Sequence, residues 1–145
     1  MRLMSFRLTV EQMRARTKTV TRRFGWWELK PGDVVQPVVK AQGLRKGEHV
    51  EKIGPPIRIV ATRVEPLDAI TAAECVLEGF PDRTPHQFAA MFVVHYSCGY
   101  GDLVNRIEFA YTACDGCPLK GPLCSDDRQV REFCIETSSH QEATP

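Results

Sequence analysis

Short β-rich segments separated by short helices are the feature that most restricts the fold of this chain. Residues 57–64 alternate and are rich in β-branched side chains, which predicts a strand. Residues 34–39 and 104–111 have the same character, and residues 1–8 open with a shorter apolar alternation. Residues 17–23 are rich in threonine and valine and form a fifth candidate strand. The pattern predicts an α+β fold, a small and partly closed β-barrel with short helices packed over its ends.

The helices between these strands have recognisable start signals. Each signal begins with a threonine at the N-cap. Thr9 and Thr71 are followed three residues later by Gln12 and Glu74, and Thr84 is followed directly by Pro85. The first helix is expected over roughly residues 10–16, and the second should end at Gly79. Phe88, Met91 and Phe92 form the apolar stripe expected to bury the third helix.

A basic, hydroxyl-rich stretch lies between the first helix and the first aromatic cluster. It contains three threonines and five cations without an acid among them: Arg14, Arg16, Lys18, Arg22 and Arg23. Cations and hydroxyls both donate hydrogen bonds to phosphate or carbonyl oxygens, so the stretch suits a polar or anionic ligand. The alternative is a solvated basic turn. Lys18 and Thr21 would point to opposite faces of a regular strand, so the chain must turn between them if they act together.

Three large aromatic residues follow this stretch, Phe24, Trp26 and Trp27. If they are exposed beside the cations, they offer a stacking surface for nucleic-acid bases. If they are buried, they form a corner of the core, which is the more common place for large aromatic side chains.

Charge is distributed unevenly along the 145 residues, although the formal net charge is only +1. Residues 1–63 carry fourteen Lys and Arg against five Asp and Glu, whereas the remainder is acidic. The two halves can pair in the fold, or the basic half can attract nucleic acid. The apolar runs are too short for a membrane span, and the N-terminus lacks the apolar region of a signal peptide, so a cytoplasmic location is expected.

Six short motifs, in this order and spacing, resemble the ASCH domain, a family of the PUA-like superfamily of β-barrels. The resemblance runs from about residue 5 to residue 111 and rests on these segments: Phe6 to Thr9, Lys18 to Arg23, Leu29 to Asp33, Glu65 to Thr71, Glu78 to Phe80, and Asn105 to Phe109. It implies a PUA-like barrel over residues 1–111 with a basic cleft that binds RNA or a modified nucleoside.

The resemblance also implies a reaction. Some small bacterial ASCH proteins are amidohydrolases that remove the acetyl group of N4-acetylcytidine through a Lys-Xaa-Xaa-Thr pair and a distant glutamate. Lys18 and Thr21 match the pair, and Glu78 matches the glutamate. In this interpretation Lys18 takes a proton, Thr21 attacks the amide carbonyl, and Glu78 protonates the leaving amine. The surrounding ligand-binding residues would be Arg16, Thr19, Arg22, Arg23 and Trp26. A different function, a non-catalytic RNA-binding or regulatory adaptor, predicts binding that weakens steeply with salt.

A cysteine-containing segment follows the proposed domain. Its four cysteines are Cys114, Cys117, Cys124 and Cys134. Four thiolates satisfy a tetrahedral zinc ion, and Gly116 allows the tight turn between the first two. An iron–sulfur cluster takes the same ligands, and reduced free thiols are the third alternative. We therefore expect residues 112–137 to form a metal-binding appendage and residues 138–145 to be a disordered tail.

Overall fold

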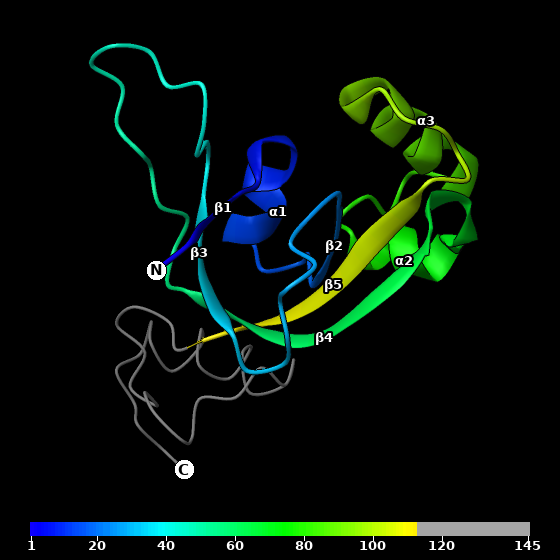
Figure 1. The fold of residues 1–145 in the computed structure, drawn as a ribbon, viewed down its shortest axis with the longest axis horizontal. Coiled ribbons are helices and arrows are strands. Elements are labelled where there is room, and N and C mark those ends of the chain that lie inside the picture. Colours follow the sequence, from blue (N-terminus) through cyan, green and yellow to red (C-terminus); the bar gives the residue numbers. More distant parts are fainter. Residues whose placement is uncertain (113–145) are drawn as a thin grey trace. The chain divides into compact units, whose positions relative to one another are not determined.

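Strands and short helices alternate along residues 1–112, the part of the chain that the structure, a computed structural model, describes (Figure 1). The elements are β1 (Leu3–Ser5), the 3-10 helix η1 (Arg7–Thr9), α1 (Val10–Arg14), β2 (Val20–Arg23), β3 (Val34–Val38), β4 (Ile57–Pro66), the 3-10 helix η2 (Leu67–Ala69), α2 (Ala72–Leu77), α3 (Pro85–Tyr96) and β5 (Leu103–Tyr111). The α+β class expected from the sequence is confirmed. Within residues 1–112, no helix has the length and apolar character needed to cross a bilayer.

The five strands form one mixed sheet in the order β1-β3-β4-β5-β2. β1 runs parallel to β3, whereas β3 is antiparallel to β4 and β2 is antiparallel to β5. The order has β1 and β2 at its two ends, so the described strands make an open sheet rather than a closed barrel. The cysteine segment and the terminal tail lie outside the described residues.

The chain divides into two compact units, and the first contains Met1–Arg7, Val34–Arg58 and, of the described residues, 110–112. Here β1 lies beside β3, with Met4 opposite Pro37 (Figure 1). Its buried apolar side chains include Val35, Val38, Ile53 and Ile57. Pro37 lies past the last residue that β3 pairs with β4, which is where a missing backbone N–H is tolerated.

The second unit contains Leu8–Asp33 and Ile59–Phe109. Its core is built by η2, α2, α3 and the start of β5, and the buried members are Leu67, Ile70, Cys75, Phe88, Ala89, Phe92 and Val104. Met91 is partly buried against this cluster, so the expected apolar stripe of α3 faces the core. In Figure 1, α2 and α3 lie at the same end of β5, where the two helices contact each other.

All three helices begin where their start signals predict, α1 with Thr9 as its N-cap, but the capping box expected at Thr9 does not form. The Thr71 hydroxyl accepts a hydrogen bond from the Glu74 amide, and Thr84 forms a complete capping box with Gln87. Thr9 makes no side-chain cap bond to α1. Instead, the Gln12 amide that was expected to close this box donates to the carbonyl of Gly79, 67 residues away, at 3.1 Å. A tertiary contact has replaced the local one.

Candidate functional site

A buried ion pair joins the segment before β2 to the end of α2, within the second unit. The Lys18 Nζ donates to the Glu78 Oε1 at 2.9 Å and to the Glu78 backbone carbonyl at 2.7 Å. Both side chains are only 3% exposed. The backbone holds the two segments together, because the Thr19 amide donates to the Leu77 carbonyl at 2.9 Å. The ammonium group therefore lies at the C-terminal end of α2, where a cation is favoured, and offsets the unfavourable position of Glu78.

Arg22 occupies the other oxygen of the same carboxylate. Its guanidinium lies 3.1 Å from the Glu78 Oε2 and 3.2 Å from the Glu65 Oε1, and the side chain is completely buried. The Nε of Arg22 is buried without a hydrogen-bond partner. A buried donor that lacks an acceptor is unfavourable by about 1–3 kcal/mol, so the carboxylates around the guanidinium must offset this loss.

A second group of charges lies next to Arg22. The Glu74 carboxylate accepts two hydrogen bonds from Arg106, at 2.8 and 3.1 Å, and lies 3.8 Å from Arg22. Arg63 lies 3.4 Å from Glu74 and 3.2 Å from Glu65, with its own side chain more than half exposed. Burial acts to raise the pKa of Glu74, but the hydrogen bond from Arg106 and the charges of the three arginines outweigh it, so its pKa lies below the ordinary value.

Burial also sets the protonation of Lys18. Loss of solvent lowers the pKa of its ammonium group below the usual 10.5, and the charges of Arg23 and Arg22 lower it further. The Glu78 carboxylate acts in the opposite direction without reversing the shift. A lysine whose pKa is lowered in this way is closer to serving as a proton acceptor than a solvated one.

Thr21 is linked through Arg23 to the buried group of charged residues formed by Lys18, Arg22 and Glu78. Thr21 is 4% exposed, and its Oγ1 accepts a hydrogen bond from the Arg23 Nε at 3.1 Å. Residues 21 and 23 share one face of β2, and Arg22 points to the other. Lys18 lies two residues before β2 begins, so the alternation of the strand does not fix its direction. Arg23 in turn is close enough to Lys18 and Glu78 for the charges to act on one another.

Gly79 allows the close approach that brings these segments together. Its φ is +94°, in the left-handed region that favours glycine. A Cβ at this position would lie 2.9 Å from the Gln12 Cγ and 3.5 Å from the Lys18 Cβ. The expected end of α2 at Gly79 is thus also the point where α2 approaches Gln12 and Lys18.

The structure joins three of the sequence-predicted residues directly, Lys18, Arg22 and Glu78, all of them buried. Thr21 is also buried, but its hydroxyl bonds to Arg23, and it lies on the face of β2 opposite Arg22. The others have different surroundings. Thr19 uses its backbone to bridge Leu77 and Phe109, and the Trp26 carbonyl accepts from Asn105 at 2.9 Å. Arg16 follows α1 with a φ of 58°. The cysteines Cys114, Cys117, Cys124 and Cys134 lie outside the described residues, and residues 1–112 contain no group of His, Cys, Asp or Glu arranged to hold a metal ion.

Three largely buried charged residues beside Arg22 were not predicted as site residues: Glu65, Glu74 and Arg106. Each stands within a motif that carried the resemblance or a helix start, but none was assigned to the site. Arg106 had the clearest signal, because it interrupts a β-rich segment whose neighbours Val104, Ile107 and Phe109 are apolar and buried. A charged side chain in such a strand needs a partner.

The cluster can move a proton and donate hydrogen bonds. Lys18 and Glu78 share a hydrogen bond along which a proton can pass. The Thr21 hydroxyl belongs to the same unit and accepts a hydrogen bond from Arg23. Arg22 and Arg23 supply donors only. Comparison with protein-family models, with curated proteins and with solved structures gave no match.

Proposed function

We propose that this chain is an ASCH-type, PUA-like protein that binds RNA or a modified nucleoside and hydrolyses an acylated base amide of the N4-acetylcytidine kind. The observation that carries the proposal is the buried pair of Lys18 and Glu78, joined at 2.9 Å. These two residues are sixty positions apart, and the resemblance had assigned them the roles of base and acid. In the same proposal, the five strands of the open sheet are those of a PUA-like barrel that is only partly closed.

The pair can generate its own base and acid. When the proton between Nζ and Oε1 lies on the carboxylate, Lys18 is a neutral amine and Glu78 is a carboxylic acid. Burial favours this arrangement, since it lowers the pKa of Lys18. Arg22 holds the second oxygen of the same carboxylate, at 3.1 Å, and so fixes its orientation toward Lys18.

In the first half of the reaction, the neutral Lys18 amine takes the proton of the Thr21 hydroxyl as its oxygen attacks the acyl carbon. The carbon–nitrogen bond then breaks, and Glu78 gives its proton to the departing N4 amine of the base. The products of this half are the free nucleoside and an acyl ester on Thr21. The hydrogen bond from Arg23 to Thr21 must open first, because it covers a hydroxyl that is 4% exposed.

In the second half, the Glu78 carboxylate takes a proton from water as the water oxygen attacks the ester carbon. The bond to Thr21 breaks, and the threonine oxygen recovers its proton from the Lys18 ammonium. One water is consumed and a carboxylic acid is released. Lys18 returns to the neutral amine and Glu78 to the acid, so both residues are ready for another cycle.

The charge arrangement favours a small neutral ligand over a phosphate backbone at this site. Lys18 and Arg22 are buried and already paired with glutamates, so neither is available to neutralise phosphates. An uncharged nucleoside with carbonyl and amide groups does not need such cations to neutralise its charge. The non-catalytic adaptor would instead have to use the exposed cations of the chain.

The experiment is hydrolysis of N4-acetylcytidine by the purified full chain, followed by chromatography of cytidine. Lys18→Ala, Thr21→Val and Glu78→Gln should each lower turnover by about 10²-fold or more, the usual effect of losing a proton-transfer group or a nucleophile. Glu11→Gln, at an exposed pair with Arg14, is the control and should keep the wild-type rate. Circular dichroism must show that each variant is folded.

Absence of turnover in the folded wild type would reject the hydrolase, and RNA binding that weakens steeply with salt would then support the adaptor.

A further inference from the structure

Two half-exposed aromatic rings lie beside the Thr21–Arg23 pair. Phe24 follows Arg23 at the end of β2, and Tyr96 is the last residue of α3; each is 37% exposed. Their ring centroids are 5.7 Å apart in an edge-to-face arrangement. Both rings rest on the buried Phe92, at 5.6 and 4.4 Å. We call Phe24 and Tyr96 the aromatic platform.

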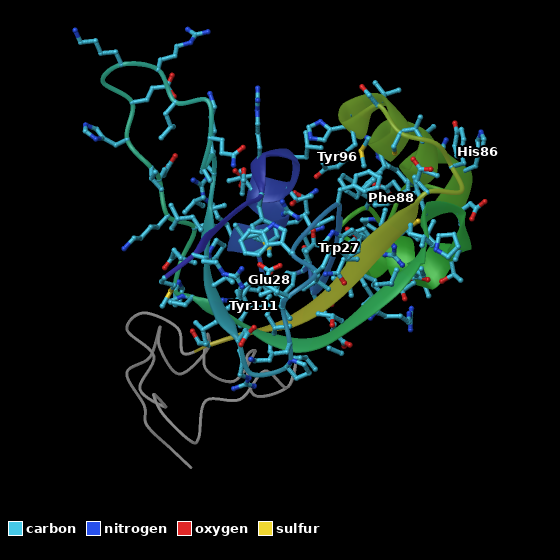
Figure 2. All side chains as sticks on the ribbon, viewed as in Figure 1. Trp27, Glu28, His86, Phe88, Tyr96 and Tyr111 are labelled. Carbon is cyan, nitrogen blue, oxygen red and sulfur yellow. The ribbon has the colours of Figure 1, made fainter. Side chains whose placement is uncertain are left out.

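The platform is built on rigid elements. Phe92 and Tyr96 are four residues apart in α3 and so share one face of the helix. Phe92 is 4% exposed and belongs to the core of the second unit. Figure 2 shows Tyr96 and His86 at opposite ends of α3. The platform rings therefore rest on the core and remain partly exposed to solvent, as a stacking surface must be.

Charge at the edge of the platform fits a nucleobase. Arg23 precedes Phe24 in the chain and bonds to Thr21, and it is close enough to Tyr96 and to the Glu78 carboxylate for electrostatic interaction with both. A guanidinium offers N–H donors and no acceptor, which suits the ring carbonyl and ring nitrogen of a base. Two partly exposed rings offer too little apolar area for a protein interface. Because their planes are 75° apart, a flat heterocycle that stacks on the face of one ring meets the other ring edge-on.

We propose that Phe24 and Tyr96 bind the base of the nucleoside, one ring by stacking and the other by an edge contact, and that Arg23 beside them holds the base so that its acyl amide reaches Thr21. This inference rests on the proposed function and adds the way in which the substrate is recognised. It predicts selectivity for flat aromatic bases over acyl amides that lack a ring. When the base engages Arg23, the guanidinium leaves the Thr21 hydroxyl, so binding and exposure of the nucleophile are coupled.

The test measures binding of cytidine, the reaction product, to the full chain by calorimetry. Phe24→Leu and Tyr96→Leu keep apolar bulk but remove the stacking face, and each should weaken the Kd about tenfold, within the usual effect of losing a base–aromatic stack. Tyr96→Phe keeps the ring and should bind within about twofold of the wild type. Tyr100→Leu is the matched control, because Tyr100 is also a half-exposed aromatic residue, but it stacks on His86 at 5.9 Å.

A second measurement uses the wild-type chain, so its result does not depend on whether a variant folds. Stacking on the face of one of these rings should shift the H5 and H6 resonances of bound cytidine upfield in the spectrum with the wild-type chain. Thr21→Val should bind cytidine at least as tightly as the wild type, because Arg23 no longer has to leave a hydroxyl, and should lose turnover, which separates recognition from chemistry. Cytidine binding lost in the leucine variants supports the platform even if no hydrolysis occurs. Hydrolysis with unchanged KM in both leucine variants would overturn the platform and leave the hydrolase standing.

Two other results would also overturn the platform. One is absence of cytidine binding to the wild type at millimolar concentration. The other is a dimer in solution that Phe24→Leu dissociates, which would assign the surface to a second copy of the chain.

Discussion

Arg22 of β2 lies directly opposite Arg106 of β5 in their antiparallel ladder. Like charges at such a position repel each other and weaken strand pairing. The Glu74 carboxylate lies close to both, with two hydrogen bonds from Arg106 and a distance of 3.8 Å to Arg22. Glu74, an acid of α2, thus offsets the repulsion between the two arginines and makes the pairing of β2 with β5 possible. It also links α2 to the buried charges of Lys18, Arg22 and Glu78.

The first prediction concerns the removal of that acid. Glu74→Gln should lower the free energy of unfolding by about 2–3 kcal/mol at pH 7, because it removes a charged, largely buried partner of two facing arginines. The pKa of Glu74 is lowered in the folded chain, so its stabilisation is complete above the unfolded value near 4.5 and is lost as the pH falls through the folded value. Urea unfolding at pH 7 and at successively lower pH values measures both effects.

The control for this prediction is Glu11→Gln. Glu11 also pairs with an arginine, Arg14 at 3.1 Å, but its side chain is 82% exposed. Its loss should change stability by at most about 0.5 kcal/mol. Equal effects of the two substitutions would mean that Glu74 is only another surface acid.

A second prediction follows from the lowered pKa of Lys18. Between the folded pKa and 10.5 the unfolded chain binds more protons at this site than the folded chain, so Lys18 makes folding more favourable as the pH rises through that window. Lys18→Met removes the titrating group and leaves the Glu78 Oε1 without its donor, which should cost about 3 kcal/mol at neutral pH. The difference in unfolding free energy between the wild type and Lys18→Met should therefore widen from pH 7 toward pH 10. A difference that narrows with rising pH would contradict the assigned direction of the shift.

Gly79 gives a third prediction. Gly79→Ala should destabilise the chain by about 2–4 kcal/mol, through left-handed strain and the approach of the new Cβ to Gln12 at 2.9 Å. Gly25→Ala is the matched control, since Gly25 has a φ of +95° and open space around it. It should lose only the strain, about 1–2 kcal/mol. Thermal unfolding of both variants separates strain from crowding, and equal losses would show that the approach to Gln12 is unimportant.

Local signals in the sequence predicted most of the elements. The capping residues Thr71 and Thr84 start α2 and α3 as expected, and the alternation over residues 57–64 marks most of β4. These features depend on neighbours within a few residues, which a sequence displays directly. The prediction at Gln12 failed for the same reason, because a partner 67 residues away took the side chain from its local role.

The site was predictable only in part. Lys18 and Glu78 were brought together by a family resemblance and not by any periodicity, since sixty residues separate them. The role of Glu74 depends on the β2–β5 register, which places Arg22 opposite Arg106 and which no local pattern reveals. The aromatic platform likewise depends on β2 ending beside α3. Long-range register is therefore the information that the sequence analysis lacked.

The fourth prediction concerns the cysteine segment. The four cysteines Cys114, Cys117, Cys124 and Cys134 are the expected metal ligands of the chain. Elemental analysis of the reduced full chain should find about one zinc ion per chain, matching four thiolates. Cys114→Ser combined with Cys117→Ser should abolish it, and Cys98→Ser, a free cysteine of the described part, should not. Iron with acid-labile sulfide would indicate a cluster instead. If the chain is metal-free and the thiols of these four cysteines all react with a thiol reagent, the four cysteines do not form a metal site.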